Sequence, residues 1–536
     1  MTEATVPLTE VFTSDYKTVP TGDVRKVLLQ YIDNCAKLFD SSPESSYIME
    51  SSKRYFSPYI TIVQSSGYGK TSLVLEIAKQ IKSYYICLRE ASSSGEPKRT
   101  SAVADSKYFS GNSEEKEENF KTLFKKLKNN ATGFNTASDL LKAQNIMNPD
   151  GNRSFWNNLL LEANENKKTS KEFILLIIDE ARSLKPVNDA ARDFYLPLRR
   201  ALSATSNIFC ILIDTNAKIA NFAPVNADDP SARVVGGEKL FHPWTCIPTM
   251  EIYMELPDVV RTWRDTITFE NQKVFEFNRF DIVRHSRPLF NRTLQMMNST
   301  EQNPEILWDN LVYFSCQKLF GGNCSEMDTA LAVLAGRYSL IPVDISTQES
   351  LVANRMATLR ACSKSRGRML VSYVAEPVLG EGFACRMADH FESIMKQLSE
   401  LMKSGRLSLA GNKGDYGELV AAVCLSTAYD VLHPGKNYFS FPVMVKAMLA
   451  KFNIRKCTIH QETRALRSSP AAEKDDTFPD VLGSLVSFMQ FVRLSKFPSR
   501  ETLRKGFERR VAFFTHTNAP ACDLVIPILL FRKAGV

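Results

Sequence analysis

The sequence lacks the cysteine and histidine motifs that hold disulfide frameworks and the common zinc sites. Its 11 cysteines are scattered and odd in number, and none forms a CxxC pair. Its six histidines form neither HxxxH nor HExxH. Scattered, unpaired cysteines are typical of proteins kept in reducing surroundings. The sequence therefore predicts an intracellular protein of the nucleus or the cytoplasm, and it argues against a metal site built on those histidine motifs.

Long apolar runs are also missing. The longest, Phe173–Ile178 and Leu524–Phe531, have the length of a strand and fall far below the roughly 20 residues of a membrane-spanning helix. The N-terminal stretch is polar and acidic, without the apolar core of a secretory signal. What is present is an ordinary globular composition, with 44% hydrophobic and 24% charged residues. At about 150 residues per domain, the 536 residues predict three to four domains. The lack of long apolar runs predicts no membrane contact.

Positive charge is concentrated at one end of the chain. The net charge is +8, and residues 490–536 contain nine Lys or Arg against three acids. A focused basic segment attracts the phosphate backbone of DNA or RNA, although a solvated helix face has the same composition. The segment is therefore a candidate nucleic-acid contact, with the solvated face as the alternative.

Strands and helices alternate in the first half of the chain. The apolar runs Tyr59–Val63, Phe173–Ile178 and Ile208–Ile213 resemble strands buried on both faces of a parallel sheet. The predicted fold class is therefore α/β, with a doubly wound parallel sheet. The predicted parts are an N-terminal lead (1–55), the sheet domain (56–280, with an insertion around 92–168), a helical lid or linker (281–408) and a C-terminal α/β module (409–536).

A glycine-rich loop between the first strand and a helical pattern predicts a P-loop. Small residues let successive backbone N–H groups point at phosphates, and the helix N-terminus adds partial positive charge. Lys70 would reach the β and γ phosphates, and the Thr71 hydroxyl would ligate Mg²⁺. The pattern G-x-x-x-x-G-K-[ST] is matched except at its first glycine, where this chain has Gln64. The predicted nucleotide-binding residues here are Gln64, Ser65, Ser66, Gly67, Tyr68, Gly69, Lys70, Thr71 and Ser72.

A second half of the same site follows the run Phe173–Ile178, which ends in Asp179 and Glu180. Acids at the carboxyl end of a buried parallel strand lie where ligands bind in such sheets. Asp179 would hold Mg²⁺, and Glu180 would be the general base that orients the attacking water. The alternative is a strand followed by an acidic helix cap. The predicted cofactors are ATP and Mg²⁺, and the predicted activity is that of a P-loop ATPase.

Two further features fit this site. Thr215 or Asn216, just after the run Ile208–Ile213, could sense the γ-phosphate, with a plain turn as the alternative. Arg287 opens the helical region and could reach the γ-phosphate from a lid, with a structural salt bridge as the alternative.

The C-terminal part carries two acids on apolar elements. Glu418 begins an apolar helical pattern, and Asp523 begins an apolar strand. A nuclease needs carboxylates from separate elements that converge on Mg²⁺, together with a basic groove for the phosphodiester backbone. Helix caps and turn residues are the alternative reading of each acid.

Five short segments follow one another along the chain: Gln64–Thr71, Ser286–Phe290, Gly414–Ala421, Phe491–Leu494 and Asp523–Pro527. In this order they resemble the fungal and oomycete families related to crinkler effectors, and the resemblance runs from about residue 55 to the end. The family has a P-loop ATPase, of AAA+/STAND type, followed by a restriction-endonuclease-like module of the PD-(D/E)xK type. The ubiquitin-like header of crinklers is not apparent.

The resemblance implies that Glu418 and Asp523 are metal-binding acids of the nuclease-like module. It also implies either an effector that is delivered into host cells and has a host-protein partner, or a transposon-derived protein, and composition does not separate these two. The family's last strand, with Glu/Gln-x-Lys, has no counterpart before the chain stops at Val536. We therefore expect nuclease activity to be lost and the module to bind DNA, RNA or a protein.

Two functional hypotheses remain open. In the first, ATP binding and hydrolysis regulate the C-terminal nucleic-acid-binding module, in an assembly that could be oligomeric. In the second, the chain is a non-catalytic effector or scaffold that uses the nucleotide as a structural switch.

Overall fold

The structure is a computed structural model of residues 1–536, in which the chain forms two compact units. The first unit combines Met1–Met254, Arg287–Thr300 and Asp344–Val371, and the second combines Glu255–Ser286, Glu301–Val343 and Ser372–Val536. Each unit is therefore assembled from separated stretches of chain. The residues that the structure describes are 23–40, 55–78, 80–89, 113–129, 173–184, 194–205, 207–214, 239–245, 247, 256–268, 274–321, 325–340, 342–362, 369–404, 407, 413–432, 439–440, 443–444, 446–447, 485–494, 497–515 and 522–529.

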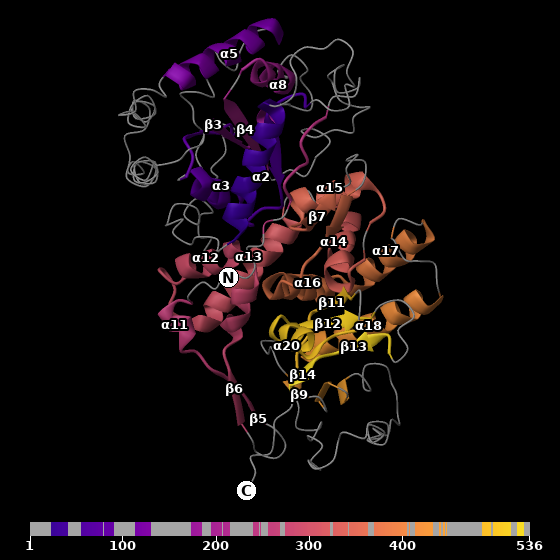
Figure 1. Ribbon diagram of the computed structural model, residues 1–536. Coiled ribbons are helices and arrows are strands. Elements are labelled where there is room, and N and C mark those ends of the chain that lie inside the picture. The colour runs from indigo at the N-terminus through magenta and orange to yellow at the C-terminus, as the bar shows by residue number, and fades with distance from the viewer. Residues whose placement is uncertain are drawn as a thin grey trace, which may run out of the picture. The chain divides into compact units, whose positions relative to one another are not determined.

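The first unit is built on a parallel sheet in the order β1-β4-β3-β2. Figure 1 shows β3 and β4 side by side. The strand β4 therefore separates the strand before the glycine-rich loop from the strand that ends in Asp179. The four strands are β1 (Tyr59–Val63), β2 (Ser83–Cys87), β3 (Ile174–Asp179) and β4 (Ile208–Asp214).

A fifth segment extends this sheet on the free side of β1. The Trp244 backbone N–H donates to Thr61 O at 2.8 Å, and the Val63 N–H donates to Trp244 O at 3.2 Å. Bridges Ile62↔Trp244 and Tyr55↔Lys239 are both parallel. Residues 239–244 thus lie beside β1, which is paired on both edges and is an interior strand.

Helices cover the sheet because its inner strands are apolar over most of their length. The residues of β1, β3 and β4 are all buried, as expected for strands covered on both faces. Ile174, Leu176 and Ile178 of β3 join one core cluster with residues of α5 and α8. The helix α3 packs on β3, and its own buried residues lie outside that cluster. The expected mixed α/β fold with a parallel sheet is confirmed.

The remaining elements of the first unit include two helices and two strands that lie beyond residue 280 in the sequence. They are α2 (Asp23–Asp40), α3 (Lys70–Ala78), α5 (Ser113–Asn129), the 3-10 helix η3 (Ala181–Leu184), α8 (Tyr195–Ser203), α12 (Pro288–Met297), α15 (Ile345–Asn354), β7 (Thr358–Cys362) and β8 (Met369–Ser372), which pairs with β7.

The second unit packs helices around two small three-stranded sheets, with β14-β10-β9 in one and β11-β12-β13 in the other. The helix α16 packs against both α13 and α14. Gly382 of α16 allows the first of these contacts, because a Cβ there would lie 2.6 Å from Ser315 Oγ. The helices are α11 (Asp258–Arg261), η6 (3-10, Arg279–His285), α13 (Pro304–Phe320), α14 (Glu326–Tyr338), α16 (Pro377–Asp389), α17 (Phe391–Lys403), α18 (Lys413–Leu432) and α20 (Arg500–Glu508). The strands are β5 (Asp265–Thr268), β6 (Val274–Phe277), β9 (Phe439–Ser440), β10 (Leu485–Val486), β11 (Gln490–Arg493), β12 (Val511–Phe514), β13 (Leu524–Val525) and β14 (Ile528–Leu529).

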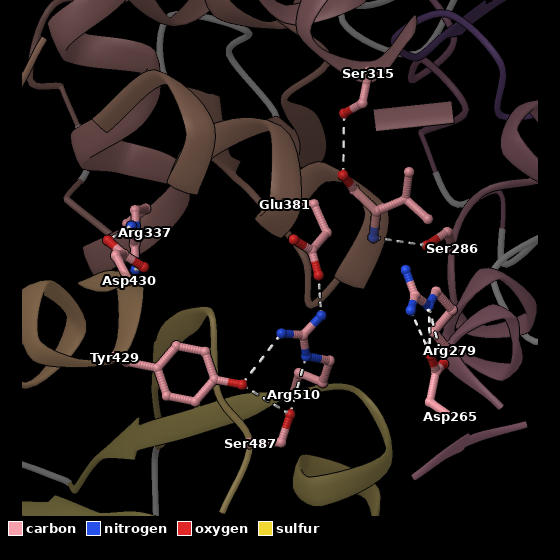
Figure 2. Close-up of polar contacts among 11 residues, drawn as sticks. Asp265, Arg279, Ser286, Ser315, Arg337, Glu381, Tyr429, Asp430, Ser487 and Arg510 are labelled. Atoms are coloured by element: carbon pink, nitrogen blue, oxygen red, sulfur yellow. Dashed lines mark hydrogen bonds and ion pairs between the residues drawn. The ribbon is translucent and has the colours of Figure 1, made fainter. Parts of the chain in front are cut away.

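Buried charges hold the second unit together (Figure 2). The fully buried Arg510 pairs with Glu381 and also donates to Ser487 Oγ at 2.9 Å and Tyr429 Oη at 3.2 Å. Because Glu381, Ser487 and Tyr429 are themselves buried, these contacts form only in the packed unit. Arg337 of α14 is also buried, and it pairs with Asp430 of α18.

Three expectations about elements need correction or fall outside the described residues. Leu524–Phe531 is not one strand, because Pro527 cannot donate to a ladder; β13 and β14 on either side of it join different sheets. Residues 113–118, expected in a mobile insertion, begin α5. Thr215, Asn216 and most of the stretch 92–168 lie outside the described residues. Among the helices of the described residues, none has the length and apolarity to cross a membrane.

Candidate functional site

The candidate site lies at the carboxyl edge of the parallel sheet, where β1 ends and α3 begins. The loop between them has two glycines with left-handed backbone, Gly67 (φ 77°) and Gly69 (φ 81°). Side chains disfavour this region, and a Cβ at Gly67 would also lie 2.6 Å from Leu289 Cβ of α12. Both glycines are therefore required by the loop's course.

Lys70, the first residue of α3, is buried against this loop. Its Nζ donates to the backbone oxygens of Gln64 at 2.6 Å and Ser65 at 2.9 Å. Burial lowers the pKa of Lys70 to about 8, with a smaller lowering from Arg287, while the nearby carboxylates, first Asp179, oppose the shift. The ammonium thus lies inside the curve of the loop, with only neutral oxygens as hydrogen-bond acceptors in these contacts.

Thr71 and Asp179 meet although they are far apart in the sequence. Thr71 Oγ1 donates to Asp179 Oδ2 at 2.9 Å, and Tyr85 Oη donates to the same oxygen at 2.6 Å. The other oxygen, Oδ1, accepts from the backbone N–H of Glu180 at 2.8 Å. A hydroxyl and a carboxylate side by side are the ligand types that Mg²⁺ takes in phosphate-binding sites. The structure thus brings the two predicted metal ligands together, and metal binding by them stays a prediction.

Glu180 is buried and held between two arginines. Its Oε1 lies 2.6 Å from Arg89 Nη2, and its Oε2 lies 2.6 Å from Arg182 Nη2. Its backbone is left-handed, with φ 55°, which is uncommon for a residue with a side chain. The carboxylate is therefore present where a general base was expected; each oxygen lies in an ion pair, and Oε2 has no hydrogen-bond partner among the described residues.

A third acid lies at the same edge. Asp214 ends β4 opposite Val63 of β1, and its Oδ2 accepts from the Arg182 backbone N–H at 2.5 Å. Our sequence reasoning did not single out Asp214, Arg89 or Tyr85 as site residues. Polar residues at the carboxyl ends of parallel strands are the usual ligand-binding positions, and that rule would have marked Asp214 and Arg89.

Gln64, which replaces the first glycine of the pattern, makes four hydrogen bonds from a side chain that is 1% exposed. Its Oε1 accepts from the N–H groups of Ser65 at 3.0 Å and Leu359 at 2.9 Å. Its Nε2 donates to Leu359 O at 3.0 Å and Thr245 O at 3.1 Å. The amide therefore pairs with Leu359 of β7 much as a neighbouring strand would, and it anchors the start of the loop.

Arg287 is a second anchor of the loop. The fully buried guanidinium donates to Ser65 Oγ at 3.0 Å, to Ser66 O at 2.8 Å and to Met356 O at 2.7 Å. It also lies over the ring of Tyr68, 4.5 Å from its centroid. The structure thus brings Arg287 to the predicted site, where these contacts fix the loop itself.

The remaining predicted loop residues are in place around these anchors. Tyr68 Oη is hydrogen-bonded to Thr358 Oγ1 of β7. Ser72 is in the first turn of α3, where backbone N–H groups have no intrahelical acceptor. Every predicted residue of the loop, with Asp179, Glu180 and Arg287, therefore gathers at one edge of the sheet.

The predicted C-terminal metal site is not assembled in the same way. Glu418 Oε2 lies 2.8 Å from Arg493 Nη2, so this carboxylate is already paired. Asp523 is exposed at the start of β13, and its backbone oxygen accepts from the Thr515 N–H. Among the described residues, no group of three or more His, Cys, Asp or Glu side chains could hold a metal ion.

Much of the basic C-terminal segment is neutralised within the second unit. Arg504 pairs with Glu501 and Glu508 on the exposed face of α20, and Lys505 also lies near Glu501. This arrangement agrees with the solvated-face alternative for α20.

Comparisons with known proteins give families without an assigned function. Residues 39–168 and 142–247 match the family model of a domain of unknown function, DUF8735, and residues 323–534 match that of another, DUF8736. No curated protein matches the chain. A solved structure, the Walker-type ATPase of Pyrococcus abyssi, is 12% identical with a TM-score of 0.33, over 69% of this chain and 99% of that one. The resemblance to crinkler families stays a prediction.

Proposed function

We propose that the first unit binds a nucleoside triphosphate with Mg²⁺ and hydrolyses it. One observation carries the proposal: Thr71 and Asp179, separated by 108 positions in the sequence, are hydrogen-bonded at 2.9 Å beside a buried lysine and a glycine-rich loop. A purely structural helix cap would need neither the lysine inside the loop nor the second strand's acid. The pattern fits phosphate binding at a helix N-terminus.

The residues present suit both the phosphates and the cation. Lys70 Nζ makes only contacts that phosphate oxygens could replace, because Gln64 O and Ser65 O are neutral acceptors. Thr71 and Asp179 offer adjacent oxygens of the kinds that Mg²⁺ prefers. When bound, Mg²⁺ would neutralise part of the charge on the β and γ phosphates.

The chain's own groups would then divide the work. Lys70 would place its positive charge against the phosphates, and Thr71 with Asp179 would hold the metal side of the nucleotide. Glu180 would orient a water molecule and accept its proton, once Arg89 or Arg182 releases one of its carboxylate oxygens. The hydrolytic step therefore requires a rearrangement of the contacts around Glu180.

Binding and turnover of ATP and GTP by the purified chain test the proposal. We expect Lys70→Ala to abolish binding, and Glu180→Gln to retain binding while turnover falls by about 100-fold or more. Lys121→Ala, on the outer helix α5, is the matched control and should behave as wild type. Absence of binding by the wild-type chain, or equal binding by Lys70→Ala, would refute the proposal.

In the part of the second unit that the structure describes, no observation favours nuclease chemistry, because Glu418 is paired with Arg493. The expected binding of DNA or RNA to the C-terminal segment, and its control by nucleotide state, stay predictions. Salt-sensitive binding without cleavage is the expected result in an assay with duplex DNA and Mg²⁺.

A further inference from the structure

A thiol and an imidazole of the first unit lie in contact, although nothing in the sequence joins them. Cys362 Sγ at the end of β7 lies 3.3 Å from Nε2 of His242, a residue of the segment that flanks β1. Both side chains are partly exposed. A nucleophile within hydrogen-bond reach of a base, which is itself oriented by a third group, is the arrangement that activates cysteines.

The third group here is a backbone carbonyl. His242 Nδ1 lies 3.0 Å from Pro243 O, which can only accept, so we assign the hydrogen of the neutral ring to Nδ1. On the other side of the ring, Nε2 lies 3.2 Å from Cys362 O as well as near Sγ.

These contacts can accommodate the shared proton on either group. With the proton on Sγ, Nε2 is an acceptor and its lone pair faces the carbonyl oxygen of Cys362. With the proton on Nε2, the N–H donates to that carbonyl and to the thiolate, while Nδ1–H keeps its own acceptor. The charged arrangement therefore gains a hydrogen bond, and hydrogen bonds of charged groups are the stronger kind.

We propose that Cys362 and His242 form a reactive thiol–imidazole pair, a modification site for peroxides and other small electrophiles. In the reaction with hydrogen peroxide, the thiolate sulfur attacks one oxygen, an S–O bond forms and the O–O bond breaks. The departing hydroxide takes the proton from His242 Nε2 and becomes water. Sulfur is oxidised to a sulfenic acid, and the peroxide is reduced.

The pair also lies next to the anchor of the glycine-rich loop. The Gln64 amide joins Leu359, three residues before Cys362, to Thr245, three residues after His242. An oxygen or alkyl group added to Sγ must occupy space at the contact between these two segments. We expect modification to push apart the two segments that Gln64 joins and so to weaken the nucleotide site; this last step rests on the proposed function.

Iodoacetamide labelling of the full chain, mapped by mass spectrometry, tests the reactive pair. Cys424 of α18, whose thiol has its pKa raised by burial, is the reference in the same molecule. We expect Cys362 to label at pH 7 on the order of tenfold faster than Cys424 or more. Its rate should fall less than about threefold from pH 9 to pH 7, where an unperturbed thiol loses about 25-fold.

His242→Asn should reduce the labelling rate of Cys362 to that of the reference, and dimedone should trap a sulfenic acid at Cys362 after peroxide treatment of wild type. Equal labelling of Cys362 and Cys424, or a steep pH profile at Cys362, overturns the proposal. The wild-type profile needs no variant, so it decides the matter even if His242→Asn does not fold.

Nucleotide affinity measured before and after labelling separates the two ideas. We expect a loss of about tenfold in wild type and no loss in Cys362→Ser treated in the same way. Fast labelling with unchanged affinity refutes the link to the loop and leaves the reactive pair intact. If the unlabelled chain binds no nucleotide, the proposed function fails, whereas the labelling result stands on its own.

Discussion

Replacing Gln64 with glycine would restore the usual first residue of a P-loop, and we expect it to damage this one. The side chain provides four hydrogen bonds to buried or part-buried backbone groups. Glycine supplies none of them. The pattern of the motif and the geometry of this loop therefore make opposite predictions for the same substitution.

The size of the effect follows from those four contacts. At about 1 kcal/mol of net stabilisation per hydrogen bond, their loss costs about 4 kcal/mol. Glycine adds roughly 0.5 to 1 kcal/mol through backbone entropy, which Gln64→Ala avoids. The alanine variant is therefore the matched control that isolates the amide.

Amide hydrogen exchange read by mass spectrometry gives the local result. Peptides that contain Ser65 and Leu359 should exchange up to about a thousandfold faster in either variant, since each 1.36 kcal/mol is about tenfold. The peptide spanning α14, in the second unit, serves as the internal reference and should not change. ATP affinity should fall in both variants.

Two outcomes would refute this reasoning. Unchanged exchange at Ser65 and Leu359 in Gln64→Ala would mean that the amide does not anchor the loop. Tighter ATP binding by Gln64→Gly would mean that the motif's glycine, and not the anchor, is what the site needs.

Three further predictions concern charged groups. Burial lowers the pKa of Lys70 to about 8, so above that pH the buried amine is mostly neutral, whereas a free lysine would still be charged. Bound phosphates should favour the charged form and so restore the proton. ATP binding should therefore take up a proton, which calorimetry in buffers of different ionisation heat measures. The ATP affinity should fall by about tenfold per pH unit above pH 8, and an affinity that stays constant up to pH 9.5 contradicts this. Arg89→Ala should free Oε1 of Glu180 and raise turnover at saturating ATP, on the order of threefold. Unchanged or slower turnover counts against a restraining role. Arg510→Met should lower the free energy of unfolding in urea by about 3 to 5 kcal/mol, because it leaves Glu381 buried without Arg510. Adding Glu381→Leu should recover part of that loss. A double variant no more stable than Arg510→Met argues against the pair.

The local parts of the site were predictable from the sequence. β1 and β4 were expected within one residue of their ends, because apolar runs without alternation report burial directly. The small residues of the loop, and Asp179 with Glu180 at the end of β3, form short motifs that can be recognised in the sequence. These features depend on neighbours in the chain, which a sequence displays.

The anchors of the loop were not predictable, because they are long-range contacts. Leu359 lies 295 positions from Gln64, and its partner atoms are backbone groups that carry no residue signature. The position of β4 between β1 and β3 depends likewise on how strands pair in space. Arg287 drew attention for its sequence context, but its acceptors on Ser66 and Met356 could only come from the fold.

The interleaving of the two units sets an order of events during synthesis. β1 ends at Val63, yet its loop is held by Arg287 and by the stretch Met356–Leu359, so the first unit lacks these contacts until about 300 more residues have been made. At cellular translation rates this takes on the order of 15 to 60 s. During that time the glycine-rich loop has none of these anchors, and the unit also lacks α12, α15 and β7. Expression of residues 1–254 alone should therefore yield an aggregating fragment, and a shortened chain must extend at least to Val371.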